Sequence, residues 1–281
     1  MSRQEALQAI GSKVQIPTLP EVVMRIGNMI DDPNVGLQEM GKLVAADPAI
    51  TARVLRLANS GYYGLSEPVC SAERAVTVIG ARSLRNVAMQ VSIVKQYEHL
   101  ASVSDFDLED LWRHSLATAT ICQALAEACY RRTGLAPDDF YACGLLHDIG
   151  KVVMLESLGD RYVECLRYAR RTGSTLHEAE QQMLSFTHIE VGALLAARWQ
   201  LPEKVAMAIE YHHGPKEMIV GNPHIAVVAI ADQIAYRSDG AACDDALDRL
   251  SALAEKVLGI RREEFARVVE RARTAPAEVL A

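Results

Sequence analysis

The sequence lacks the features of membrane, secreted and disulfide-stabilised proteins. No apolar run in its 281 residues approaches the roughly 20 residues that cross a bilayer, and the first residues contain no apolar core of a signal peptide. The six cysteines include no close pair such as Cys-x-x-Cys, so they suggest neither a disulfide framework nor a thiolate zinc site. We therefore expect a cytoplasmic protein whose cysteines are small buried hydrophobes.

An excess of positive charge is also missing. Lysine and arginine total 29 against 36 aspartates and glutamates, which gives a formal net charge of −7. The chain thus carries no strong signal for nucleic acid or for a membrane surface as a partner. We interpret its most suggestive basic patch as a solvated face, with a site for a phosphorylated or acidic partner as the alternative: Arg53, Arg56, Arg82 and Arg85.

Sustained alternation of apolar and polar residues, which would indicate strands, is absent, whereas helical spacing occurs almost everywhere. Half of the residues are hydrophobic, enough for a sizeable core. The sequence predicts an all-α fold, a multi-helix domain with an N-terminal helical bundle packed against it. We divide the chain into that bundle (1–104), a central subdomain (105–237) and a C-terminal helical extension (238–281).

Local signals place several helix ends. Thr18 to Glu21 has the pattern of a capping box with a proline at the first helical position, and Asp47-Pro48 repeats the device. Gly80 separates two helical patterns in a position suited to a left-handed C-cap. A long helix is predicted from about Leu108 to Arg132. The segment from Ala226 to Ala235 is long enough to be a buried helix rather than a strand.

Histidines and aspartates recur in one order along the second half of the chain, each beside an apolar helical stretch able to hold it in place. Imidazole and carboxylate without thiolate is the ligand mixture that iron, manganese or zinc favours at open hydrolytic centres. The sequence therefore predicts a buried metal site. The predicted ligands are His114, His147, Asp148, His188, His212, His213 and Asp232.

Residues 144–151, Gly-Leu-Leu-His-Asp-Ile-Gly-Lys, form the centre of this series. An apolar helix delivers His147 and Asp148 and then breaks at a glycine. Adjacent residues of a helix point about 100° apart, so both reach one metal only where the helix ends or where two metals lie side by side.

This stretch resembles the His-Asp signature of the HD superfamily of metal-dependent phosphohydrolases, and the other ligand segments follow in the same order. The chain is most similar to the HDOD family, the HD-related output domain of bacterial signalling proteins, over roughly residues 10–237. The matching features are Ile16-Pro17-Thr18-Leu19-Pro20, Asp47-Pro48-Ala49-Ile50-Thr51 through Leu57-Ala58-Asn59-Ser60, Ala75 to Gly80, and Trp199-Gln200-Leu201-Pro202.

The resemblance implies a bacterial signal-transduction module with a mono- or dinuclear metal site and a signalling protein as partner. The implied metal is divalent, iron or manganese, or else zinc or magnesium. Two alternatives stay open: an active phosphohydrolase on a nucleotide or another phosphoester, and a metal-free protein-interaction scaffold. Because some 10 residues precede the match, we expect a stand-alone protein regulated by a partner, by a phosphorylated or nucleotide ligand, or through the bundle surface.

An active site of this kind would use the metal to activate water and to neutralise phosphoryl oxygens. Asp148 or a metal-bound hydroxide is then the candidate base, and Lys151 is the candidate phosphate-binding residue, with a solvated surface lysine as the alternative reading. Asp110, one turn before His114, is either an additional ligand or an exposed first-turn acid favoured by the helix dipole.

Other features limit the site. The remaining histidines, His99, His177 and His224, are expected in surface or capping roles. The related HD-GYP cyclic dinucleotide phosphodiesterases carry a Gly-Tyr-Pro loop after the histidine pair, whereas this chain continues with Gly214-Pro215-Lys216-Glu217. That departure makes cyclic di-GMP a weaker substrate candidate.

Overall fold

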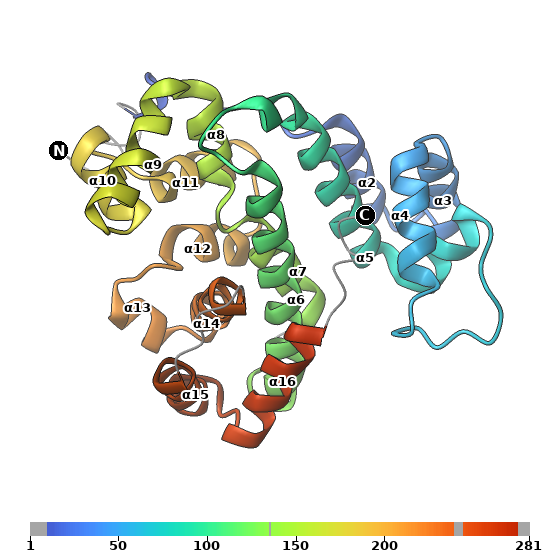
Figure 1. The fold of residues 1–281 in the computed structure, drawn as a ribbon. Helices are drawn as coiled ribbons and strands as arrows, with labels where there is room; N and C mark the ends of the chain where they lie inside the picture. Colours follow the sequence, from blue (N-terminus) through green and yellow to red (C-terminus); the bar gives the residue numbers. More distant parts are fainter. Residues whose placement is uncertain (1–9, 135, 239–243, 275–281) are drawn as a thin grey trace. The chain divides into compact units, whose positions relative to one another are not determined.

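The computed structural model describes residues 10–134, 136–238 and 244–274 (Figure 1). Every regular element in these ranges is a helix and none is a strand, which confirms the all-α prediction. Contacts group residues 19–98 into one compact unit and the described residues before and after them into a second. The three-part division at residues 104 and 237 stays a prediction.

The unit of residues 19–98 is a small helical bundle with its own core. In α4, Ile50, Val54 and Ala58 recur at helical spacing and are fully buried among the apolar side chains of α3 and α5. Its helices are α2 (Glu21–Asp31), α3 (Leu37–Ala45), α4 (Pro48–Ala58) and α5 (Ala72–Gln96).

Two helix ends in this unit follow the sequence, and one does not. The Asp47 side chain accepts hydrogen bonds from the backbone nitrogens of Ala49 and Ile50, at 2.9 and 3.1 Å, as a cap should. Gly80 interrupts the helical pattern of α5 as predicted, but its φ of 79° comes with an extended ψ of 169° and not with the ψ of a left-handed C-cap; only glycine adopts this conformation readily. The predicted cap at Thr18 is wrong: Pro20 keeps an extended ψ of 136°, so the helix begins at Glu21, beyond the reach of Thr18.

The second unit contains the long helices and most of the chain. Its α6 packs along α7 and α14, and Ile225 to Ala231 of α14 are buried, so the Val- and Ile-rich segment is a helix as predicted. The elements are α6 (Leu108–Thr133), α7 (Pro137–Leu146), α8 (Ile149–Leu158), α9 (Asp160–Thr172), α10 (Leu176–Leu184), α11 (His188–Arg198), α12 (Glu203–Tyr211), α13 (Lys216–Gly221), α14 (Pro223–Ser238), α15 (Asp244–Leu258) and α16 (Arg262–Thr274). A 3-10 turn, η1 (Glu98–Ser102), follows α5.

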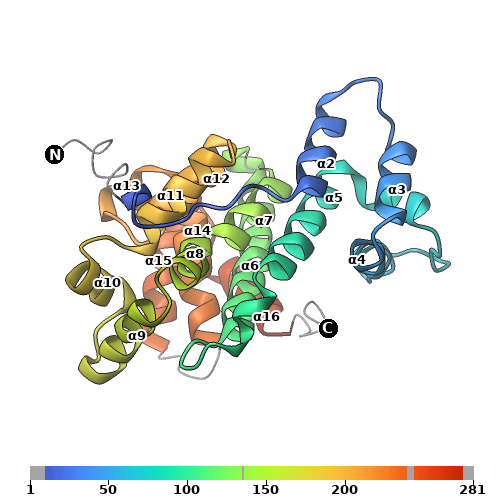
Figure 2. The ribbon, with the colours of Figure 1, turned by 90° about the horizontal axis from the view of Figure 1, so that it is seen from above.

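Two glycines let helices approach closely in the second unit. A Cβ at Gly144 of α7 would lie 2.5 Å from the Cα of Ala119 in α6. A Cβ at Gly150 of α8 would lie 1.9 Å from the backbone oxygen of His188, where α11 begins beside α8 (Figure 2). Such contacts are tighter than any Cβ tolerates, so glycine sets the spacing of these helices.

The other expectations for the fold have mixed outcomes. Cys122, Cys129, Cys143 and Cys165 are buried as expected, whereas Cys70 is exposed; Cys243 lies outside the described residues. No helix in the described part of the chain is long and apolar enough to span a membrane.

Candidate metal centre

The His147-Asp148 pair lies in the break between two helices. Here α7 ends at Leu146 and α8 begins at Ile149, with His147 as the C-cap of the first and Asp148 as the N-cap of the second. The helix therefore breaks at the pair itself, whereas the sequence predicts the break at Gly150. Gly150 belongs to α8, and its role is the close contact with α11 described above.

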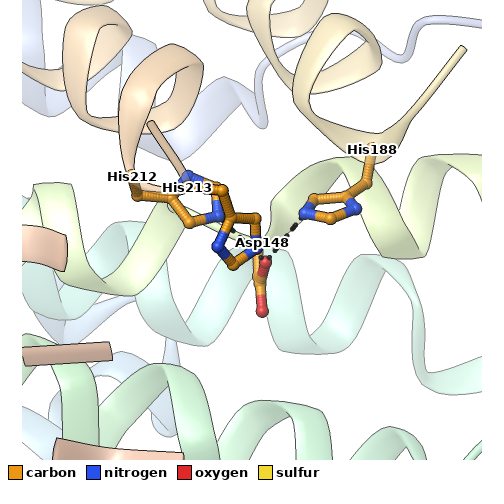
Figure 3. A group of neighbouring side chains, drawn as sticks. All are labelled: Asp148, His188, His212 and His213. Carbon is orange, nitrogen blue, oxygen red and sulfur yellow. Dashed lines mark ion pairs between the residues drawn. The ribbon is translucent and has the colours of Figure 1, made fainter. Parts of the chain in front are cut away.

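Four residues form the first group of ligand atoms (Figure 3). One nitrogen or oxygen from each of Asp148, His188, His212 and His213 lies within 4.8 Å of the others. His188 opens α11, and His212 and His213 follow the last turn of α12. Asp148, His188 and His212 are buried, whereas His213 is exposed, so the group has one side towards solvent.

Three residues form the second group, in which the ligand atoms of His114, His147 and Asp232 also lie within 4.8 Å of one another. His114 Nε2 is 3.0 Å from Asp232 Oδ1 and 3.3 Å from His147 Nε2. Asp148 joins the groups: its Oδ1 is 3.5 Å from Nε2 of both His188 and His212, and its Oδ2 is 3.4 Å from His147 Nε2. All seven residues selected from the sequence thus meet in two adjacent groups.

Hydrogen bonds on the outer side fix which imidazole nitrogen faces inwards. His147 Nδ1 is 2.7 Å from the Gly144 carbonyl oxygen, and His212 Nδ1 is 3.0 Å from that of Ile209. A carbonyl only accepts hydrogen bonds, so each Nδ1 carries a hydrogen and donates it. In the neutral rings, Nε2 therefore presents a lone pair to the centre, the arrangement that a metal-binding histidine requires.

The first group contains ligand atoms that protein contacts leave unsatisfied. Asp148 Oδ1, His188 Nε2 and His212 Nε2 are buried, and none has a hydrogen-bond partner among the described residues. A buried polar group without a partner costs about 1–3 kcal/mol, and here three converge on one point. Their chemistry, two imidazoles and a carboxylate, fits a divalent cation.

Electrostatics around the pair are dominated by the two aspartates. Burial alone would lower the pKa of His147, but Asp148 and Asp232 raise it to about 10. Burial would raise the pKa of Asp148, but Lys151 and His147 hold it well below its usual value, and hydrogen bonds from His114 and His147 do the same for the pKa of Asp232. Both carboxylates are thus ionised at neutral pH, as metal ligands must be, whereas metal-free His147 is protonated there and a bound cation would displace the proton from its Nε2.

The remaining candidates differ in position. Lys151 Nζ lies 2.5 Å from Asp148 Oδ2, and its side chain is only 19% exposed, so it is part of the site and not a solvated surface lysine. Asp110 is 55% exposed and pairs with Arg113 at 3.2 Å, outside both groups. The reading of Asp110 as an exposed first-turn acid is the one that the structure supports.

Two side chains near the centre were not selected from the sequence. Glu180 of α10 is fully buried, and its Oε2 lies 2.6 Å from His188 Nδ1. His177, one turn earlier, is half-buried with its ring 6.1 Å from that of His188 and 5.8 Å from that of His213, although it belongs to neither group of ligand atoms. In the sequence, both look like ordinary polar residues of an amphipathic helix.

The other two histidines lie away from the centre. His99 is 58% exposed beside Glu156, as expected. His224 is partly buried, stacks on Phe140 with ring centroids 5.4 Å apart, and belongs to neither group of ligand atoms.

Comparison with known proteins gives a family match and several relatives. The family model of the HDOD domain matches residues 16–215 of this chain. An uncharacterised protein of Treponema pallidum is 30% identical over 229 residues, which are 80% of this chain and 43% of that protein. Ribonuclease Y of Thermus thermophilus is 30% identical over 168 residues, 59% of this chain and 24% of that enzyme. The chain therefore spans less than half the length of these curated relatives.

Solved structures share the fold over nearly the whole chain. An HDOD domain protein of unknown function from Geobacter sulfurreducens is 29% identical, with a TM-score of 0.76 and coverage of 99% of this chain and 96% of that one. A candidate phosphohydrolase from Shewanella amazonensis is 23% identical, with a TM-score of 0.72 and coverage of 99% and 95%. The MmoQ response regulator of Methylococcus capsulatus is 25% identical, with a TM-score of 0.50 and coverage of 91% and 98%.

Proposed function

Because the chain belongs to the HDOD family, we propose that it is a bacterial signal-transduction module built around a metal site, with a signalling protein as its partner. The observation that carries the metal site is the proximity of three buried ligand atoms that lack a hydrogen-bond partner: Asp148 Oδ1, His188 Nε2 and His212 Nε2. The similarity to a response regulator favours the signalling role.

The two groups of ligand atoms would hold the metal through residues already named. Asp148, His188, His212 and His213 form one position; His114, His147 and Asp232 form the other, with the second oxygen of Asp148 directed towards it. Five of these seven residues are histidines, which favours iron, manganese or zinc over the oxygen-preferring magnesium. We therefore propose iron or manganese first, then zinc.

A second candidate function is phosphoester hydrolysis, which one specific observation favours. Lys151 places an ammonium group against the central aspartate, in a partly exposed position where its remaining hydrogens can contact a phosphoryl oxygen. When bound, a divalent metal supplies Lewis-acid charge for the phosphoryl group and for an attacking water. Asp148 would keep Lys151 oriented, and His213 forms the solvent side of the centre.

The test measures metal content and hydrolysis on the same sample. Protein purified without chelator or histidine tag is analysed by plasma mass spectrometry, then assayed against p-nitrophenyl phosphate, its bis-ester, nucleotides and a short RNA. The RNA is included because one relative is a ribonuclease. Bound metal without hydrolysis supports the regulatory module, and hydrolysis that Asp148→Asn abolishes supports the enzyme. A protein unable to bind metal supports the metal-free protein-interaction scaffold instead.

A further inference from the structure

Among the described residues, Glu180 is the only glutamate that is completely buried. Its Oε2 accepts a hydrogen bond from the His188 backbone nitrogen at 3.0 Å and lies 2.6 Å from His188 Nδ1. Its Oε1 accepts a hydrogen bond from the Tyr162 hydroxyl at 2.7 Å, and Tyr162 is itself fully buried. The carboxylate thus receives three donors, and two of them come from one candidate ligand.

Burying the Glu180 carboxylate at this position costs free energy. Removing a charge from water is unfavourable, and an apolar side chain of similar volume often serves packing as well or better. The three donors explain how the charge is tolerated, because they replace its lost hydration. The donors do not explain why a charged side chain occupies this position. The contact between the carboxylate and His188 does explain it.

Among the candidate ligands, His188 differs in what lies behind it. His147 and His212 each donate Nδ1–H to a neutral backbone carbonyl, whereas His188 faces a carboxylate. The ionised carboxylate accepts from Nδ1 and leaves the Nε2 lone pair towards Asp148 Oδ1, 3.5 Å away. A negative charge behind an imidazole also makes its inner nitrogen a stronger metal ligand.

We propose that Tyr162, Glu180 and His188 form a positioning relay that sets the affinity of the first metal position and the electronic environment of its ion. This inference rests on the proposed metal site. Glu180 and Tyr162 are positioning residues, since they act through His188 and do not touch the metal. The relay joins α9 and α10 to the ligand that opens α11.

The chain supplies a matched control for the relay. Tyr168 of α9 also reaches across to α10, where its hydroxyl donates to Gln182 Oε1 at 3.0 Å, but this exposed pair contacts none of the seven ligand candidates. Tyr162→Phe and Tyr168→Phe therefore each remove one hydrogen bond between the same two helices, and only the first removes a member of the relay.

The experiment titrates the metal-depleted full chain with Co²⁺ in the presence of a competing chelator and records the visible spectrum of the bound ion. Glu180→Gln keeps the shape and removes the charge, so we expect Co²⁺ binding weaker by about 10- to 100-fold and a shifted spectrum. Tyr162→Phe should weaken binding less and shift the spectrum in the same direction, while Tyr168→Phe should match the wild type. Thermal unfolding confirms that each variant folds. If Glu180→Gln does not fold, the comparison of Tyr162→Phe with Tyr168→Phe still tests the relay.

The possible failures are distinguishable. A wild-type protein that binds no Co²⁺ contradicts the proposed metal site, and the relay with it. Wild-type binding that Glu180→Gln leaves unchanged in affinity and spectrum contradicts the relay alone, as would equal effects of the two tyrosine variants. Nitrogen NMR of the metal-free protein gives an independent check, because a hydrogen on Nε2 rather than Nδ1 of neutral His188 would also overturn the relay.

Discussion

At the scale of single residues, Asp148 connects every part of the candidate centre. One of its oxygens faces His188 and His212, and the other faces His147 and Lys151. The sequence identifies Asp148 through the His-Asp pair, but it does not reveal this division of the two oxygens. That division depends on the break between α7 and α8, because α8 packs on α11 and α7 packs on α12.

Asp148→Asn should lose metal and stability together. The amide is a weaker ligand, and it leaves Lys151 without its charged partner and His147 with Asp232 alone in a buried site. Removing one member of a buried ion pair typically costs about 3–5 kcal/mol, so we expect a loss of that order in the free energy of unfolding of metal-free protein. Urea denaturation and metal analysis check this, with exposed Asp110→Asn as the control; unchanged metal content would remove Asp148 from the ligand set.

Lys151→Met should separate metal binding from phosphate binding. Lys151 contacts Asp148 but is a cation, so its removal leaves the metal ligands in place and takes away a competing positive charge. We expect full metal content and, if the chain hydrolyses phosphoesters, a rate at least about 10-fold lower at unchanged protein concentration. A variant that loses its metal, or that hydrolyses at the wild-type rate, would argue against a phosphate-binding Lys151.

At the scale of the elements, close helix contacts decide where the ligands lie. Local signals such as Asp47-Pro48 and Gly80 predict helix ends correctly because a cap or a positive φ acts within a few residues. Gly150 does not mark a helix end, although a glycine suggests one in the sequence. It allows a close contact with α11 at His188, 38 positions later. Glu180 is hidden for a related reason: helical spacing gives no sign that its carboxylate faces a buried imidazole.

Gly150→Ala should disturb the α8–α11 contact and the metal site together. The added Cβ meets a backbone oxygen at 1.9 Å, which cannot rotate away, so α11 must shift and carry His188 with it. We expect a loss of about 1–3 kcal/mol or more in the free energy of unfolding, and weaker metal binding. Gly27→Ala in α2 is the matched control, since nothing lies within 4 Å of its Cβ position and alanine should stabilise that helix by about 0.5–1 kcal/mol. Equal stability changes in the two variants would contradict this packing account.

The attachment of α16 to α6 should depend on pH. Glu264 accepts hydrogen bonds from the Arg261 backbone nitrogen and from Arg132, and these contacts hold its pKa below the usual 4.5. A depressed pKa means that the ionised form contributes stability above pH 4.5 and that the contribution disappears as pH falls through the folded-state value. Glu264→Gln should therefore be less stable than the wild type at pH 7 and equal to it at the lowest pH where both fold, as measured by thermal unfolding. A constant difference across pH, or none beyond that of the neighbouring exposed Glu263→Gln, would contradict the assignment.

At the scale of the whole molecule, the seven ligand candidates lie in one of the two compact units but are far apart in sequence, from His114 to Asp232. They come from α6, the turn before α8, α11, the end of α12 and α14. The order of histidines and aspartates predicts the membership of the site, because each lies beside a helix that packs in the same core. It does not predict their division into two groups or the carboxylate behind His188, which depend on how the helices pack.

A bound metal would link five elements of that unit, so metal content is the most direct test of the account. Plasma mass spectrometry on protein purified without chelator or histidine tag should find about one or two equivalents of iron, manganese or zinc in the wild type and little in Asp148→Asn. A metal-free wild type that also takes up none of these ions when they are added would contradict the central claim, and the buried histidines would then belong to a scaffold for protein partners.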